Sequence, residues 1–163
     1  MYPYLFNTDK RRRIASIVAT KFERTKFSPI EGIQVQPLQL IHGGDYVAYG
    51  FDFHFLDVQK SLVYLSDFNK IPKETLQYVL DKKNVHVLVL DCLHESQEHF
   101  SHASLQESLS YAKKLASEGL NIEKLLLVGM ACELEHEETN EKLKKVEQLA
   151  DVSLAFDGLK LSF

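Results

Sequence analysis

Tryptophan is absent from this 163-residue chain, and cysteine is scarce, with only Cys92 and Cys132. Two cysteines are too few for a disulfide framework, so we expect a reducing compartment. Long hydrophobic runs are also missing: a bilayer-spanning helix needs about 20 apolar residues, and the apolar runs here are shorter. No charged segment followed by an apolar leader opens the sequence. We therefore expect a cytoplasmic protein without membrane contact.

An excess of positive charge is likewise lacking, because the formal net charge is −4. The only basic run, Lys10–Arg13, is short and is typical of a solvated helix face, so we expect no nucleic-acid partner. The hydrophobic content of 45% suits one domain with a core. We expect a single domain over residues 1–163, with residues 1–30 as an N-terminal arm and a weak helix or irregular arm at 9–23.

From residue 33 onward the hydrophobic pattern indicates regular structure. Alternation of apolar and polar residues predicts strands in 33–42 and 46–57, and a third, 61–67, antiparallel to the second. Nearly continuous apolar runs at 85–91 and 123–130 are typical of strands buried on both faces. The end of the chain, 152–163, reads as a strand pair turning at Asp157-Gly158.

Helices are predicted between these strands, at 71–83, 104–119 and 136–150. The second has a clear apolar stripe: Leu105, Leu109, Ala112 and Leu115. Alternation of helices with buried strands predicts an α/β protein with one mixed β-sheet and helices packed on at least one face.

Four polar residues each follow or end a predicted strand, namely His42, Asp67, Asp91 and Cys132. Strand ends at one edge of a sheet converge in space, where α/β proteins usually build sites. Histidine, aspartate and cysteine are also the residue types that ligate zinc, iron or manganese. The sequence therefore favours a metal or catalytic site at this edge.

Structural roles remain open for each of these residues. His42 precedes Gly43-Gly44 and could belong to a turn, while Asp67 and Asp91 could cap the segments that follow. Cys132 could be a small buried hydrophobe.

The remaining histidines also have ordinary explanations. His94, His99 and His102 share one predicted loop, where solvation is the default, and His54 and His86 alternate with core residues in strands. No single residue decides between structure and chemistry.

Five segments in this order resemble the carboxyl-terminal half of a metallo-β-lactamase-fold hydrolase, the αββα sandwich. They look most similar to the carbon–phosphorus-lyase-type phosphodiesterases, which cleave cyclic ribose phosphates. The segments are "PLQLIHGGDYVAYGF", "VYLSDFNKIPKETL", "VLVLDCL", "SHASLQESL" and "LVGMACELEHEETNEKL".

The resemblance implies a role for each of the four polar residues at the strand ends, and for His102. His42 would ligate a metal, and Asp67 would bridge two metal ions, offsetting their repulsion. Asp91 and His102 would be the catalytic pair beside the leaving group. Cys132 stands where related proteins carry a histidine ligand; a thiolate suits zinc better than manganese. His136 is either a substitute ligand or a histidine of the helix's first turn.

The family's defining His-x-His-x-Asp-His motif is missing from this sequence. The remaining ligands, His42, Asp67 and Cys132, are marginal for one zinc or manganese ion and insufficient for two.

Two functions therefore stay open. One is a metal-dependent hydrolase, with a small phosphodiester as substrate, that obtains the missing ligands elsewhere. The other is a non-catalytic half-domain that serves as a binding or assembly module. Either would leave apolar side chains such as Phe51, Phe53, Leu62 and Tyr64 exposed, so we expect a homodimer or a partner that supplies the missing half.

Overall fold

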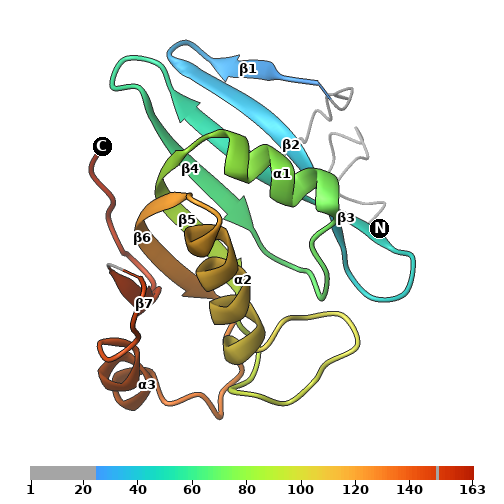
Figure 1. The fold of residues 1–163 in the computed structure, drawn as a ribbon, viewed down its shortest axis with the longest axis vertical. Coiled ribbons are helices and arrows are strands. Elements are labelled where there is room, and N and C mark those ends of the chain that lie inside the picture. The colour runs from blue at the N-terminus through green and yellow to red at the C-terminus, as the bar shows by residue number, and fades with distance from the viewer. Residues whose placement is uncertain (1–24, 150) are drawn as a thin grey trace, which may run out of the picture.

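A computed structural model describes residues 25–149 and 151–163, so the expected weak helix at 9–23 lies outside the described residues. The described part contains one seven-stranded sheet whose spatial order follows the sequence (Figure 1). The strands are β1 (Phe27–Ile30), β2 (Ile33–Ile41), β3 (Val47–Phe55), β4 (Lys60–Leu65), β5 (Asn84–Asp91), β6 (Asn121–Val128) and β7 (Val152–Leu154). The helices are α1 (Lys73–Asp81), α2 (Leu105–Ser117) and α3 (His136–Leu143).

The sheet is mixed, as the sequence predicts. Strands β1 to β4 pair antiparallel, and β4 to β7 pair parallel. The predicted antiparallel pairing of the second and third expected strands is confirmed by β3 and β4, which place Asp52 opposite Val63. The parallel strands are joined through α1, α2 and α3, which is the usual connection between parallel strands.

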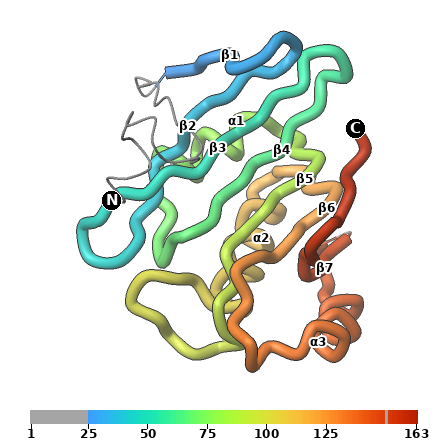
Figure 2. Tube along the Cα trace, turned by 180° about the vertical axis from the view of Figure 1, so that it is seen from behind, coloured from blue at the N-terminus to red at the C-terminus, as the bar shows by residue number. Residues whose placement is uncertain are grey.

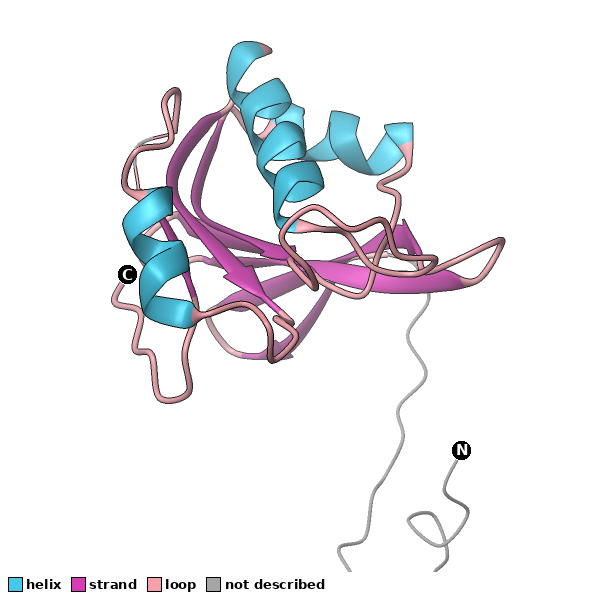
Figure 3. Cartoon of the chain, turned by 90° about the horizontal axis from the view of Figure 1, so that it is seen from below, coloured by secondary structure: helices cyan, strands magenta, loops and turns pink. Residues whose placement is uncertain are grey.

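Helices α1 and α2 lie on one face of the sheet (Figures 1 and 3). The predicted stripe of α2 is buried in the main core together with strand residues such as Val63, Leu88 and Leu125. Ser104 is the N-cap residue of α2: its side chain accepts a hydrogen bond from the backbone N–H of Glu107, and the Glu107 side chain accepts one from the backbone N–H of Ser104, forming a capping box. None of the helices in 25–149 and 151–163 is long and apolar enough to cross a bilayer.

The opposite face of the sheet carries no helix within the described ranges (Figure 2). Instead the last residues of the chain run along it. Leu159, Leu161 and Phe163 pack against a small cluster formed by the buried residues Val87, Val89 and Leu126. Phe163 also stacks on Phe55, with ring centroids 4.4 Å apart.

Three boundaries differ from the sequence-based expectation. Residues 27–30, expected in the N-terminal arm, form β1 and pair with β2. Helix α3 ends at Leu143 instead of reaching residue 150, because the chain turns to pack Val146 and Leu149 against the core. In 152–163, β7 is a single strand; a turn does form at Asp157-Gly158, but no second strand follows it.

Candidate active site

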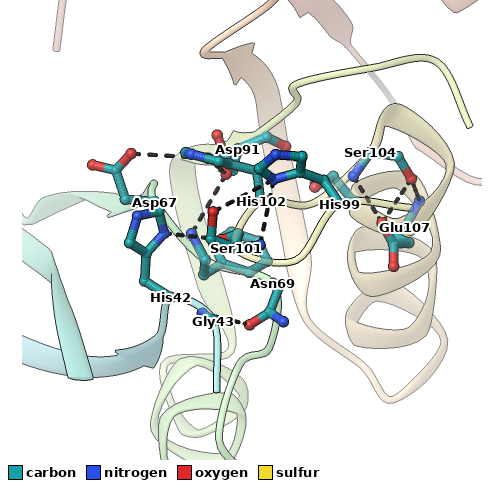
Figure 4. Close-up of polar contacts among 12 residues, drawn as sticks. His42, Gly43, Asp67, Asn69, Asp91, His99, Ser101, His102, Ser104 and Glu107 are labelled. Carbon is teal, nitrogen blue, oxygen red and sulfur yellow. Dashed lines mark hydrogen bonds and ion pairs between the residues drawn. The ribbon is translucent and has the colours of Figure 1, made fainter. Parts of the chain in front are cut away.

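The sheet topology brings the carboxyl ends of β2, β4 and β5 to one edge. Strand β3 runs antiparallel to both β2 and β4, so β2 and β4 point the same way, and β5 is parallel to β4. His42 follows β2, Asp67 follows β4 and Asp91 ends β5. Figure 4 shows these three side chains around His102, which comes from the loop before α2. Three of the four polar residues at predicted strand ends, His42, Asp67 and Asp91, therefore lie together as expected.

Asp91 and His102 form the central contact of this site. The Nδ1 atom of His102 donates to Oδ2 of Asp91 at 2.7 Å, and the backbone N–H of Phe68 donates to the same oxygen at 3.4 Å. Asp91 is 1% exposed, and this burial raises the pKa of its carboxyl group, while the contact with His102 lowers it. The carboxylate thereby fixes the orientation and the tautomer of the imidazole.

A glycine makes room for the other oxygen of this carboxylate. Gly129, just after β6, has a φ of +82°, and a Cβ atom there would lie 2.8 Å from Oδ1 of Asp91. From the other side, the Ser108 hydroxyl of α2 donates to the Asp91 carbonyl at 2.6 Å. The position of Asp91 is therefore fixed by β6 and α2 as well as by its own strand.

His42 lies edge-on to His102, with ring centroids 4.7 Å apart. Its Nδ1 is 2.9 Å from the carbonyl oxygen of Ser101, which can only accept, so Nδ1 carries the proton and Nε2 the lone pair. A backbone carbonyl behind one ring nitrogen is the usual arrangement of a metal-ligating histidine. His42 thus has the form that its expected role requires.

Asp67 completes the cluster from the turn after β4. Its Oδ1 lies 4.0 Å from Nδ1 of His102, and its side chain is 67% exposed. The residue has a φ of +58°, a left-handed conformation that aspartate tolerates better than most residues. This carboxylate therefore faces solvent beside the Asp91–His102 pair and is open to a ligand.

Asn69 has a positioning role that sequence reasoning missed. Its Oδ1 accepts from the backbone N–H of Gly43 at 3.2 Å, and its Nδ2 donates to the carbonyl of Phe100 at 2.8 Å. The Phe100 ring packs so closely on Gly43 that a Cβ there would lie 2.6 Å from a ring carbon. These contacts tie the loops that carry His42 and His102 together. The only signal in the sequence was the turn propensity of asparagine.

Cys132 is not joined to this cluster in the described part of the chain. It is exposed, and its thiol lies 3.8 Å from Oε2 of Glu133. His136 sits in the first turn of α3 and donates from Nε2 to the carbonyl of Ala155 at 3.3 Å. Among the described residues, no group of three or more His, Cys, Asp or Glu side chains is arranged to hold a metal ion.

The donor set therefore fits a metal centre only in part. His42 presents the correct tautomer and Asp67 an accessible carboxylate, but a catalytic zinc ion takes about three protein ligands. Residues 25–149 and 151–163 alone do not complete such a centre.

Comparison with solved structures identifies the fold. A diphosphatase from the PhnP family aligns with a TM-score of 0.69 and 30% identity, over 87% of this chain and 47% of its own. The metallo-β-lactamase-fold protein YhfI from Bacillus subtilis aligns with a TM-score of 0.61 and 17% identity, over 85% and 53%. This chain has a metallo-β-lactamase fold. The expected resemblance to metallo-β-lactamase-fold proteins is confirmed, and a PhnP-family protein is among the matches.

The metallo-β-lactamase fold here is only partial, because the chain spans about half the length of the structures it matches. The same holds for zinc-bound PqqB from Methylobacterium extorquens, which aligns with a TM-score of 0.59 and 13% identity over 86% of this chain and 54% of its own. Comparison with family models gave no match. Comparison with curated proteins also gave none.

Proposed function

We propose that this chain forms part of a metal-dependent phosphodiesterase whose remaining metal ligands come from another polypeptide segment or a second copy. The observation that carries the proposal is the buried Asp91–His102 pair, which shares one strand-end edge with His42 and Asp67. The 30% identity with a PhnP-family diphosphatase supports chemistry at a phosphoryl group.

In this proposal each residue has a distinct task. Asp91 accepts from Nδ1–H of His102 and orients the ring, so that Nε2, when it carries a proton, donates that proton to the leaving-group oxygen and is left with a lone pair. His42 and Asp67 would hold a zinc or manganese ion through an imidazole nitrogen and a carboxylate oxygen. The metal would act as a Lewis acid toward the phosphoryl oxygens.

A second candidate function is a non-catalytic assembly module. Two observations on residues 25–149 and 151–163 favour it: their metal-ligand set is incomplete, and one face of the sheet, on which Tyr64 is 38% exposed, carries none of their helices. Here the polar edge would persist for its turn and capping contacts alone.

The two candidates are separated by metal analysis and by hydrolysis of bis-p-nitrophenyl phosphate with added zinc or manganese. Asp67→Ala is expected to abolish turnover, because the exposed carboxylate is needed by the metal. It should lower the free energy of unfolding by no more than about 2 kcal/mol, the cost of alanine in the left-handed conformation of this residue. Asp157→Ala, in an exposed turn, is the matched control and should leave turnover unchanged.

Absence of both bound metal and turnover in the unmodified protein would leave only the assembly function. Turnover that survives Asp67→Ala would place the chemistry elsewhere.

A further inference from the structure

A small polar pocket lies at the end of the sheet away from the candidate active site. Asp52 and His54 belong to the second half of β3, opposite the start of β2, whereas the active-site edge is at the start of β3. The pocket has a volume of about 120 Å³, far above the roughly 10–15 Å³ that one water needs. Its lining residues are Lys26, Gln34, Gln36, Asp52, His54 and Lys82.

Asp52 is buried there with half of its carboxylate unsatisfied. The side chain is 3% exposed, and Oδ2 accepts from the Tyr78 hydroxyl and from Nζ of Lys82, both at 2.7 Å. Oδ1 is buried and has no hydrogen-bond partner among the described residues. Buried acceptors in folded proteins are nearly always paired, so this oxygen calls for a donor that the described residues do not supply.

His54 presents a second unsatisfied atom on the same face. It lies two residues after Asp52 in β3, and its Nδ1 is buried without a partner in the described part of the chain. Tyr78 does not relieve the carboxylate further, because its hydroxyl already donates to Oδ2.

The charges around the pocket define the class of ligand. Two lysines, Lys26 and Lys82, face the single carboxylate of Asp52, so the lining carries an excess of positive charge and favours an anion. The anion must also donate a hydrogen bond, because Oδ1 of Asp52 can only accept. A fully deprotonated anion would be repelled, because its negatively charged oxygens would face that carboxylate without a hydrogen bond.

We propose that this pocket binds inorganic phosphate, with a P–OH group donating to Oδ1 of Asp52. The other phosphate oxygens accept from Lys82, Lys26 and Nδ1–H of His54. Inorganic phosphate keeps a proton throughout the neutral range, whereas sulfate has none, and a phosphomonoester has none above its second pKa of about 6.

The test is calorimetric titration of the full chain at pH 8 and constant ionic strength with potassium phosphate, potassium sulfate and methyl phosphate. Saturable binding of phosphate alone is the expected result. Equal binding of sulfate, or no binding of phosphate, would overturn the proposal, the latter meaning that water alone fills the pocket. Binding is read without turnover, so the outcome is independent of the proposed hydrolase activity.

Replacing the acceptor Asp52 should reverse the preference for phosphate over sulfate. A variant that merely fails to fold would lose binding of both anions. Asp52→Asn adds an N–H donor, so phosphate affinity should fall at least tenfold while sulfate affinity rises. Lys26→Gln, at an exposed lining position, should weaken phosphate binding without altering the circular dichroism spectrum. Lys144→Gln, on the exposed end of α3, is the matched control. Unchanged selectivity in the Asp52→Asn variant would show that the lysines alone attract anions.

Discussion

The two cysteines differ sharply in environment. Cys92 is fully buried, and burial, aided by the charge of Asp91, raises the pKa of its thiol to about 12. Cys132 is exposed. Since the thiolate is the reactive form, Cys92 should be inert at pH 8 and Cys132 should react.

Titration with a disulfide reagent should therefore detect one thiol in the native protein and the second only after unfolding. Cys132→Ser should remove the native signal. Rapid reaction of both thiols in the native state would contradict the burial of Cys92.

Asp91 should make stability depend on pH in a defined direction. Because its pKa is raised in the folded state from the ordinary value of 3.8, folding favours the protonated form. Its ionisation therefore weakens stability as pH rises from about 3.8 through the raised value, and the loss persists at higher pH.

Asp91→Asn removes this titration. As pH rises from 3 to 7, the free energy of unfolding of the wild type should fall relative to that of the variant, as measured by urea unfolding. A shift in the opposite direction would mean that the contact with His102 outweighs the desolvation of the carboxylate.

At the scale of the element, the start of α2 sets the position of His102, two residues before the cap. The Ser104 hydroxyl accepts from the Glu107 N–H at 3.3 Å, and the Glu107 carboxylate accepts from the Ser104 N–H at 2.8 Å. Ser104→Ala should lower the free energy of unfolding by about 0.5–2 kcal/mol.

Ser110→Ala, on the exposed face of the same helix, should change the free energy of unfolding by no more than about 0.5 kcal/mol. Equal effects of the two substitutions in urea unfolding would show that the capping box does not stabilise the helix.

The elements were predictable wherever a hydrophobic period was complete. The stripe from Leu105 to Leu115 predicted α2, and alternation predicted β2 to β4, because each period leaves only one face for the core. The end of α3 was not predictable, because Val146 and Leu149 fit a continuing helix as well as the turn that packs them on the core.

The same reasoning separates the candidate site into two parts. Asp67 and Asp91 could be placed from sequence, because parallel strands fix where their ends meet. Cys132 could not, because its loop after β6 is shaped by tertiary contacts such as the Ala131 N–H to Leu93 carbonyl bond. Asn69 was missed for a similar reason, since its partners lie 26 and 31 residues away.

For the whole molecule, the two faces of the sheet differ in how far other elements cover them. Among the residues that the structure describes, one face is covered by α1 and α2, whereas the other is covered only in part, by residues 159–163. Phe51 and Tyr64 lie opposite each other on this second face, near Phe53 and Leu62. The matched solved structures are about twice as long as the aligned region. We infer that an additional layer packs on this face.

A second copy of the chain is the simplest source of that layer, so we expect a homodimer. Sedimentation velocity should show a concentration-dependent shift from monomer to dimer. Tyr64→Glu should move the equilibrium toward monomer at least tenfold, because it places a charge among apolar side chains at the contact. Val58→Glu, which also places a charge on an exposed apolar residue but in the β3–β4 turn, should leave the equilibrium unchanged.

A monomer at every concentration would exclude the homodimer. If such a monomer still bound an apolar dye, and Tyr64→Glu reduced that binding, the helix-free face would be exposed and would require a different polypeptide. If Tyr64→Glu left the monomer–dimer equilibrium unchanged, the dimer contact would lie on another surface. An additional layer would also bring side chains to the edge that holds His42 and Asp67. If the second copy supplies the missing ligands in this way, Tyr64→Glu should weaken both dimerisation and metal binding.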